Sequence, residues 1–569
     1  MGVIKTYIIV VDGMRADYIG SMGHQGLLTP TMSSLLSEGV YFNNCTSIMP
    51  ANTGTNHTAI LTSAYAESHG ILGIGGYYSG LDFTRPWFSS RYGNATAKIF
   101  THKHLRTPTI FNIIKERDAT LKTAFITGKT WLGRIIPDED CDIIIYPGNT
   151  PGNSDEYNPN PNYVTLSEGY VLGGLAHLED NEIFPRVYIP RVGGDMGEAP
   201  PGTVNLSPVD FDSDKLPSDH WVMTQAIKCI TYDDPDFLYI VLMNMDLAGH
   251  AYGSFKSTEI GDMTENLNPS MFRNPNATKD QLYITDQEIK RFVTYLKDNN
   301  RWNTSRIIIT SDHGMSTMKS VISKVSRHSI LHWFLSKIHH VTNPSYYYQF
   351  TPLPAAERLD IDIRQILADH GIHMRAGTGG FFNRYNPRGD YDWMVSEGPN
   401  GYVYNASVET QQRIKDILTN YTITENGETI KPIWKVLIRS EQSDTINDYT
   451  GKPFKLGGDN HLDMIWPSVI IFCKPGYMIP MYNDQLNSAL MPLMIKMKLP
   501  SFIDIRTATG AHGTYPEQLI PLIIVSPSEP DVPVGVTCDD PVSVVDISPT
   551  ITSLNGWGVP SSFIGSPLL

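Results

Sequence analysis

Three short apolar runs in the chain each lead to an aspartate, and in two of them a histidine follows closely. The runs are Tyr7–Asp12, Leu238–His250 and Arg306–His313. A short apolar run that ends in a ligand-type residue is typical of a buried strand that delivers this residue at its carboxyl end. Open parallel sheets bind ligands at that edge, so the sequence predicts one site made of carboxylate and imidazole donors. Such a donor set suits a divalent metal such as zinc.

A fourth segment places the hydroxyl of Thr53 between a strand-like stretch and a helix-like one. A hydroxyl at the start of a helix lies near free backbone N–H groups, which stabilise anions. Each of these residues also has a structural alternative. Thr53 could be a helix N-cap, Asp12 and Asp312 could be strand-end caps, and His250 and His512 could be hydrogen-bonded core histidines. So many ligand-type residues at strand ends nevertheless favour a metal site.

The bulk composition indicates a soluble globular protein with a large core. The chain has 569 residues, of which 41% are hydrophobic and 18% charged. No segment approaches the roughly 18 uninterrupted apolar residues that span a bilayer. The formal net charge of −15 argues against general binding to nucleic acid or anionic membranes. The five cysteines are widely spaced and indicate core residues rather than a disulfide framework or a zinc motif.

Strand–helix alternation divides the chain into an α/β core and two insertions. Residues 1–146, 218–316 and 465–569 are predicted to be three parts of this core. Residues 147–217 are rich in Pro, Gly, Asn and Asp, which predicts a loop-rich insertion. Residues 317–464 are predicted to form a cap over the sheet edge. The helices expected along the chain are Thr29–Glu38, Thr109–Lys115, Ile284–Asn299, Ile330–Ile338 and Val408–Leu418.

Six ordered motifs resemble the nucleotide pyrophosphatase/phosphodiesterase branch of the alkaline phosphatase superfamily. They are Val11–Arg15, Thr53–Thr58, Glu67–Ile71, Asp246–His250, Ser311–Met315 and Gly510–Gly513. Each is short, but together they span almost the whole chain in the family's order. The resemblance implies an alkaline-phosphatase-like α/β fold, in which helices flank a mostly parallel central sheet and a cap region is inserted.

The same resemblance implies two zinc sites, although other divalent metals could fill them. One site would use Asp246, His250 and His512, and the other Asp12, Asp312, His313 and the hydroxyl of Thr53. Metal coordination would lower the pKa of the Thr53 hydroxyl and make it a nucleophile. The second metal would hold the leaving oxygen and later activate the water that hydrolyses a phospho-threonine intermediate.

Two further segments are similar to phosphonoacetate hydrolase, a relative that cleaves phosphonates. Ile126–Gly133 looks like that family's lysine-bearing loop, and His512–Ile524 looks like the strand entry after its last metal histidine. This resemblance implies that Lys129 contacts phosphate or carboxylate, whereas the structural alternative is a solvated surface lysine.

The chain departs from the family at the residue that binds the phosphoryl oxygen. The family places an asparagine there, and this chain has Ile74. Loss of a preorganised donor can cost roughly 3 kcal/mol of transition-state stabilisation. We therefore expect Asn56, Lys129 or a backbone N–H to replace it, or the substrate to present a different oxygen.

Other activities of the superfamily fit the sequence less well. A sulfatase needs a Cys or Ser in a Cys/Ser-x-Pro-x-Arg setting, which Cys45 lacks. A phosphoglycerate mutase would have Ser in place of Thr53, and phosphoethanolamine transferases usually carry membrane helices. A binding protein that lost catalysis is disfavoured because clustered buried carboxylates are costly without a cation.

The sequence thus predicts hydrolysis of phosphodiester or pyrophosphate bonds, with phosphonate C–P hydrolysis as the alternative. The partner would be a small phosphodiester, nucleotide or phosphonate rather than a nucleic acid duplex. The exact substrate, the oligomeric state and the cellular compartment stay open. The chain opens almost directly on its first strand and shows no signal peptide, although one removed earlier would not be seen.

Overall fold

The fold is described from a computed structural model. It describes residues 4–20, 22–23, 26–73, 77–78, 105–129, 132, 140–147, 164–166, 169–171, 219–255, 275–318, 320–322, 356–358, 361–376, 393–425, 427–457, 464–479, 481–482, 503–504 and 510–569. The predicted helix Ile330–Ile338 and most of the 147–217 insertion lie outside these residues. Among the helices so described, none is long and apolar enough to cross a membrane.

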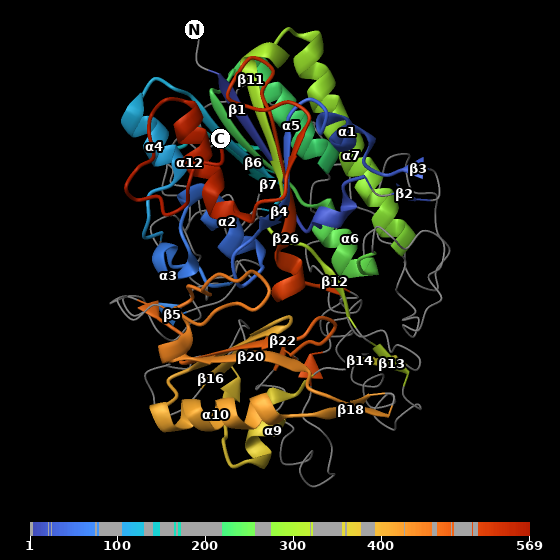
Figure 1. Cartoon of the computed structure of the whole chain (residues 1–569), viewed down its shortest axis with the longest axis vertical. Helices are drawn as coiled ribbons and strands as arrows, with labels where there is room; N and C mark the ends of the chain where they lie inside the picture. The colour runs from blue at the N-terminus through green and yellow to red at the C-terminus, as the bar shows by residue number, and fades with distance from the viewer. Residues whose placement is uncertain are drawn as a thin grey trace.

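An eleven-stranded sheet forms the centre of the larger part of the molecule (Figure 1). Its middle is a row of five parallel strands, which are β11 (Ser305–Thr310), β1 (Lys5–Val11), β10 (Phe237–Leu242), β6 (Thr123–Thr127) and β7 (Ile143–Pro147). These strands are almost continuously Ile, Val, Leu and Phe, as expected of strands buried on both faces. The predicted mostly parallel α/β sheet is confirmed.

Antiparallel and short strands extend both sides of this row. On the β11 side, β26 (Leu519–Val525) pairs antiparallel with β11, and β4 (Val40–Thr46) pairs antiparallel with β26. At the edge, β27 (Val536–Cys538) and β28 (Val542–Ser543) both pair parallel with β4. On the other side, β7 pairs with β9 (Gly169–Val171) and β9 with β8 (Val164–Leu166). These last two strands fall within the predicted loop-rich insertion, where triplets this short give no detectable period-2 pattern.

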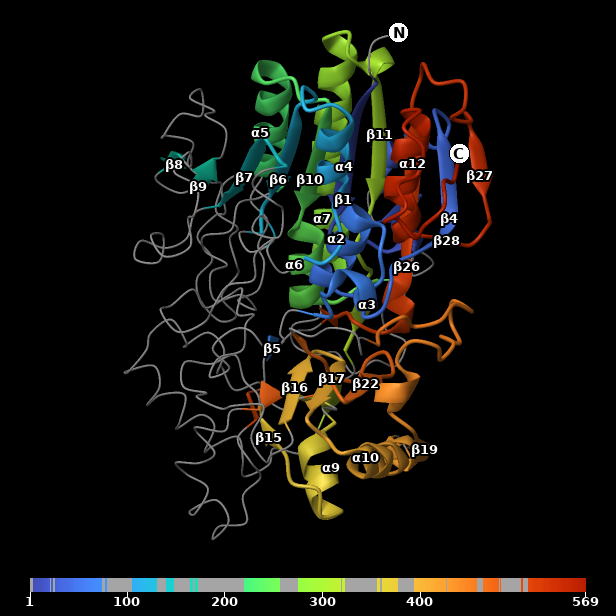
Figure 2. The same cartoon turned by 90° about the vertical axis from the view of Figure 1, so that its left-hand side faces the viewer.

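Helices cover both faces of the sheet. On one face lie α1 (Pro30–Leu35), α5 (Asp219–Tyr232) and α7 (Pro275–Asp298), and on the other lie α2 (Thr53–Thr62), α4 (Ile110–Arg117) and α12 (Ile547–Leu554) (Figures 1 and 2). Each layer buries its own hydrophobic cluster against the sheet. Four of the five cysteines are buried, and all five are free thiols, which confirms that most of them are core residues.

The strand register brings several carboxyl ends to one edge. Val11 lies opposite Leu242, Val10 opposite Thr310, and Thr127 opposite Val241. Because the strands are parallel, the residues that follow β11, β1, β10 and β6 leave the sheet side by side. The next helix after β10 is α6 (Asn244–Tyr252), which begins at this edge.

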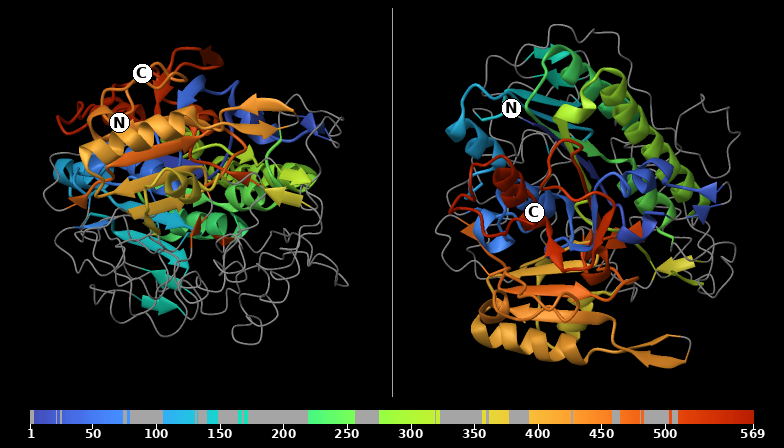
Figure 3. Two further views of the ribbon diagram at one scale, coloured as in Figure 1. Left: turned by 90° about the horizontal axis from the view of Figure 1, so that it is seen from below. Right: turned by 45° about the horizontal axis from the view of Figure 1, so that its top comes forward.

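A smaller five-stranded sheet lies beyond this end of the central sheet (Figures 1 and 3). Its strands, in order, are β15 (Arg375–Ala376), β16 (Trp393–Glu397), β17 (Asn400–Tyr404), β22 (Val469–Cys473) and β20 (Ile433–Ile438), and α9 (Ile363–Asp369) and α10 (Val408–Asn420) pack on it. The boundary that we expected at residue 464 falls inside this sheet, because β22 pairs with β17 and β20. An apolar five-residue run does not reveal from sequence which of two sheets it joins.

The remaining elements are short. The helix α3 spans Ala66–His69, and the two-stranded ladders are β2 (Met22–Gly23) with β3 (Gly26–Leu27), β5 (Tyr77–Tyr78) with β21 (Met464–Ile465), β12 (Ser316–Thr317) with β25 (Gly510–Ala511), β13 (Ser320–Ile322) with β14 (Ala356–Arg358), β18 (Ile423–Glu425) with β19 (Glu428–Ile430), and β23 (Met481–Tyr482) with β24 (Ile503–Asp504).

Candidate active site

Neighbouring strands of the central sheet place charged side chains at one edge. Asp12 directly follows β1, Asp312 lies just after β11, and Lys129 lies just after β6. Gly13 has φ +78°, and a Cβ at this position would lie 2.8 Å from the Asp246 Cα. Glycine therefore lets the chain after β1 pass against the neighbouring segment. The predicted convergence of Asp12 and Asp312 is present in the structure.

Asp246 and His250 lie on a helix rather than at the end of a strand. Our interpretation of Asp246 as the end of the apolar strand run is wrong, because β10 stops earlier and α6 begins at Asn244. Residues four apart share one face of a helix, and the His250 Nε2 lies 3.3 Å from the Asp246 Oδ1. The His512 Nε2 lies 3.6 Å from the same oxygen. The structure therefore brings this predicted ligand set together.

Thr53 is the first residue of α2, and it is not the N-cap. Asn52 takes the N-cap position, and its Oδ1 accepts a hydrogen bond of 3.1 Å from the Thr55 N–H. The Thr53 hydroxyl is thus not used for capping and lies 3.1 Å from the His313 Nε2. Thr53 is 2% exposed. Its hydroxyl is therefore buried, and it lies at the N-terminus of α2 among the predicted metal ligands.

The three candidate ligand histidines are oriented in the same way. Each Nδ1–H donates to a backbone carbonyl, at 2.8 to 3.0 Å, from His313 to Gly314, from His250 to Gly510 and from His512 to Ala51. A neutral imidazole bonded in this way directs the lone pair of its Nε2 toward the site. Burial lowers the pKa of His313 to about 3 and that of His512 well below its ordinary value, which favours the neutral rings.

The carboxylates of the site carry more negative charge than their described neighbours balance. The Asp12 Oδ1, Asp246 Oδ1 and Asp312 Oδ2 are buried without a hydrogen-bond donor among the described residues. Burial and then the nearby Asp312 raise the pKa of Asp12 well above its ordinary value. Buried anionic oxygens without donors are costly unless a cation pairs with them, so the donor set fits divalent metal ions.

Two groups of ligand atoms are close enough to hold such ions. The atoms of each group lie within 4.8 Å of one another, and the groups are Asp246, His313 and His512, and Asp12, Asp312 and His313. His313 belongs to both groups, and its ring stacks on that of His512 with centroids 3.5 Å apart. The two predicted sites are therefore adjacent.

Lys129 lies inside the site, so the alternative of a solvated surface lysine is wrong. Its Nζ lies 2.6 Å from the Asp12 Oδ2, 2.8 Å from the Asp246 Oδ2 and 3.4 Å from the Thr53 hydroxyl. Burial opposes the charged form, but the surrounding carboxylates outweigh it and raise the pKa of Lys129. A fixed positive charge thus lies beside Thr53 and between the two groups of carboxylates.

Asn56 does not face the site with a free donor. Its Oδ1 accepts from the Ile48 N–H at 2.7 Å, and its Nδ2 lies 3.1 Å from each of three backbone carbonyls, those of Ile48, Pro50 and Asn52. This amide fastens the loop that precedes α2. The geometry contradicts our prediction that Asn56 binds substrate, because both of its N–H groups are committed to the backbone.

We predict that Asn56→Ala lowers stability rather than substrate binding. Removing the amide leaves buried backbone groups without partners, which costs about 1–3 kcal/mol for each group, so we expect a loss of about 3 kcal/mol in urea unfolding. The exposed Asn420 provides the control, and Asn420→Ala should change stability by no more than about 0.5 kcal/mol. A raised KM with unchanged unfolding would instead return Asn56 to the substrate site.

Ile74, the departure from the family's asparagine, lies outside the described residues. Sequence reasoning also missed His57 and Tyr239, which lie behind Asp312. His57 lies within the Thr53–Thr58 motif, which could have pointed to it as a site residue. Tyr239 lies in an apolar run, where sequence indicates only a buried strand residue.

Comparisons with known proteins identify the family of the chain. The sequence profile of the type I phosphodiesterase/nucleotide pyrophosphatase family matches residues 6–489. Rat ectonucleotide pyrophosphatase/phosphodiesterase family member 1 is 42% identical over 67 residues, which are 12% of this chain and 7% of that protein. Mouse bis(5'-adenosyl)-triphosphatase enpp4 is 28% identical over 108 residues, 19% of each chain. The chain thus matches only a small part of the length of these relatives.

Solved structures show the same fold at low sequence identity. The alkaline phosphatase PafA superposes with a TM-score of 0.56 and 14% identity, covering 100% of this chain and 99% of the other. Murine ectonucleotide pyrophosphatase/phosphodiesterase 5 superposes with a TM-score of 0.51 and 14% identity, covering 98% and 96%. With the profile matched over most of its length, the chain belongs to the type I phosphodiesterase/nucleotide pyrophosphatase family, within the alkaline phosphatase superfamily.

Proposed function

We propose that the protein is a two-zinc hydrolase that cleaves phosphodiester or pyrophosphate bonds through a phospho-threonine intermediate on Thr53. The observation that carries this proposal is the position of the Thr53 hydroxyl. It lies at the N-terminus of α2, 3.1 Å from the His313 Nε2 and 3.4 Å from the Lys129 Nζ, beside both groups of ligand atoms.

The residues present would hold two ions in the division that the family resemblance implies. Asp246, His250 and His512 would hold one, and Asp12, Asp312, His313 and the Thr53 hydroxyl would hold the other. When bound, the metals supply Lewis-acid stabilisation of the attacking and leaving oxygens and lower the pKa of a bound hydroxyl or water. Zinc is our choice because the donors are imidazole and carboxylate.

The chain's own groups would then position and stabilise the reacting phosphoryl group. Thr53 attacks phosphorus in line, the bond to the leaving oxygen breaks, and water later displaces the threonine oxygen. The N-terminus of α2 directs backbone N–H groups toward developing negative charge. Lys129 adds a positive charge within reach of the same oxygens. With Asn56 committed to the backbone, Lys129 and these backbone N–H groups are the candidates for the role of the family's asparagine.

The choice of bond follows the family. Relatives carry names that describe pyrophosphatase, phosphodiesterase and bis(5'-adenosyl)-triphosphatase activities. An inactive threonine-to-alanine variant of murine ectonucleotide pyrophosphatase/phosphodiesterase 5 has been solved in complex with AMP. These names support a nucleotide or another phosphodiester as the substrate class.

Hydrolysis of a phosphonate C–P bond is the second candidate, and the placement of Lys129 favours it. That reaction releases a carbanion, which is stabilised by an adjacent carbonyl of the substrate. In a substrate such as phosphonoacetate this carbonyl belongs to a carboxylate, so the enzyme needs a cation close to it. The Lys129 ammonium lies 3.4 Å from the Thr53 hydroxyl and is 9% exposed, which places a cation at reaction distance.

The experiment that tests the proposal is hydrolysis by the zinc-loaded protein of bis-(p-nitrophenyl) phosphate, p-nitrophenyl phosphate and phosphonoacetate. Turnover dominated by the diester is the expected result. Phosphate release from phosphonoacetate alone would move the assignment to C–P hydrolysis. No turnover of any of the three, with zinc verified, would contradict the proposed function.

We predict that Lys129→Met lowers kcat/KM for the preferred substrate by about 10²-fold, as expected when one preorganised charged donor is lost. Zinc affinity should not fall, because the substitution removes a cation that competes for Asp12 and Asp246. Steady-state kinetics and chelator competition measure the two quantities. Lys122→Met, at an exposed position just before β6, is the matched control and should retain full activity. Weaker zinc binding in Lys129→Met would show that Lys129 is structural.

A further inference from the structure

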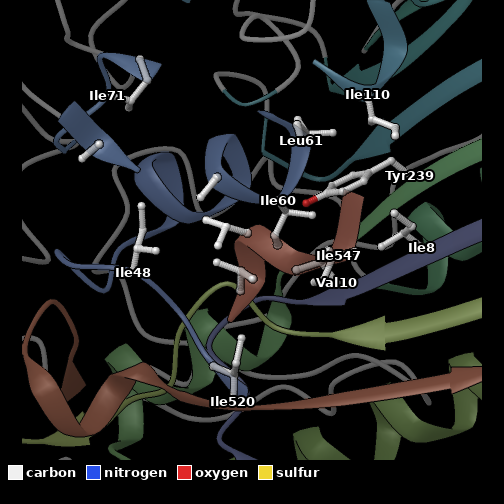
Figure 4. Close-up of a cluster of buried hydrophobic side chains, with 14 of the residues drawn as sticks. Ile8, Val10, Ile48, Ile60, Leu61, Ile71, Ile110, Tyr239, Ile520 and Ile547 are labelled. Atoms are coloured by element: carbon white, nitrogen blue, oxygen red, sulfur yellow. The ribbon is translucent and has the colours of Figure 1, made fainter. Parts of the chain in front are cut away.

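A tyrosine and a histidine behind the site form a chain of contacts that reaches a proposed metal ligand. Tyr239 lies in the middle of β10, and its ring packs in the hydrophobic cluster with Ile60, Leu61 and Ile110 (Figure 4). Its hydroxyl lies 2.8 Å from the Nδ1 of His57 in α2. Both side chains are completely buried, and neither belongs to the nucleophile or ligand set.

The other nitrogen of His57 faces Asp312. The His57 Nε2 lies 3.5 Å from the Asp312 Oδ2. The other carboxylate oxygen, Oδ1, is already fixed, since it accepts from the backbone N–H groups of His313 at 2.9 Å and Gly13 at 3.2 Å. Oδ2 is thus the oxygen left for a metal, and the described groups that approach it are the rings of His57 and His313.

The tautomer of His57 follows from the charges on either side. A neutral imidazole carries one N–H, and its second nitrogen is an acceptor. A lone pair on Nε2 would face the carboxylate oxygen of Asp312, which is repulsive. A hydrogen on Nε2 is attracted to that oxygen and requires Nδ1 to accept, and the Tyr239 hydroxyl can donate to it. In the arrangement that these charges favour, the Tyr239 O–H donates to the His57 Nδ1, and the His57 Nε2–H lies on the side of the Asp312 Oδ2. At 3.5 Å the attraction between this N–H and the carboxylate oxygen is electrostatic, and neither atom has a hydrogen-bond partner among the described residues.

We propose that His57 and Tyr239 are positioning residues that fix the Asp312 carboxylate for metal binding. The inference rests on the proposed metal site, and it concerns the ion held by Asp12, Asp312 and His313 rather than the one held by Asp246. Outer partners of a metal ligand orient it, and their loss typically weakens metal binding by 10- to 100-fold.

Tyr239→Phe is the sharpest test, because it removes one oxygen and keeps the ring that packs in the core. We expect the full-length variant to bind one of its two zinc equivalents at least about 10-fold more weakly than the wild type in chelator competition. Tyr7→Phe is the matched control, because Tyr7 is equally buried on the adjacent strand β1 but packs in the hydrophobic cluster on the opposite face of the sheet. This control should bind both ions as the wild type does.

A second pair of variants separates positioning from packing. His57→Gln keeps an N–H donor and should retain more zinc affinity than His57→Leu, which fills the space without any donor. Equal zinc binding by wild type and Tyr239→Phe, measured on folded protein, would overturn the inference. A wild type that binds no zinc would instead overturn the proposed function.

Discussion

Thr53→Ala is expected to lower hydrolysis of the diester substrate by at least about 10³-fold, since loss of a covalent nucleophile removes the first bond-forming step. The variant should keep both zinc ions. The ion that Thr53 would contact keeps Asp12, Asp312 and His313 as ligands, and the other ion does not use Thr53. The measurement combines kcat/KM with the zinc content of the purified variant.

Thr62→Ala is the matched control for this substitution. Thr62 is a buried threonine at the opposite end of α2, and its hydroxyl bonds within the helix to the Thr58 carbonyl. Activity close to that of the wild type is expected there. Retained activity in Thr53→Ala would show that water attacks directly or that another residue is the nucleophile.

His250→Ala is expected to remove one zinc ion and leave the other. His250 lies near the Asp246 and His512 side chains, and in the proposed division it would bind only their ion. Loss of groups that merely orient a ligand weakens metal binding by up to about 100-fold, so loss of the ligand itself should cost at least that much. Metal analysis after gel filtration should find one zinc per chain, and Asp246→Asn should behave in the same way.

Two further variants, His313→Ala and His220→Ala, serve as comparisons for His250→Ala. His313 is a proposed ligand of the ion at Asp12 and Asp312, and its ligand atom also lies within 4.8 Å of those of Asp246 and His512. Its loss should therefore remove the first ion and weaken binding of the second. His220 is half exposed and bonds to Glu288 on the surface, so its replacement should leave two zinc ions bound. If His250→Ala released both ions together, the two sites would be coupled rather than separable.

The sequence predicted the convergence of the site well where a ligand directly follows a strand. Asp12 and Asp312 follow β1 and β11, and the parallel register then places them side by side. The sequence-based prediction failed for Asp246, which lies on α6 rather than at the end of β10. Over so few residues, the start of a helix that directly follows a strand shows the same apolar pattern as a longer strand. Lys129 stayed undecided, because the burial of a lysine depends on carboxylates from distant segments.

The contacts behind the site could not have been predicted. Asn56 matched a family motif, but only the fold shows that its amide is used by the loop at Ile48–Asn52. Tyr239 is an aromatic residue in an apolar strand, and sequence alone gives it a packing role. Its hydroxyl has a partner because the fold brings His57 of α2 within 2.8 Å of it.

The central claim is a covalent bond between phosphorus and the Thr53 oxygen. The most direct test is to quench the zinc-loaded enzyme with acid during turnover of bis-(p-nitrophenyl) phosphate and to examine its peptides by mass spectrometry. We expect a p-nitrophenylphosphoryl adduct on the peptide that contains Thr53, formed as one p-nitrophenolate leaves, and no adduct in Thr53→Ala. Continued turnover with that peptide unmodified, or an adduct on another residue, would contradict it.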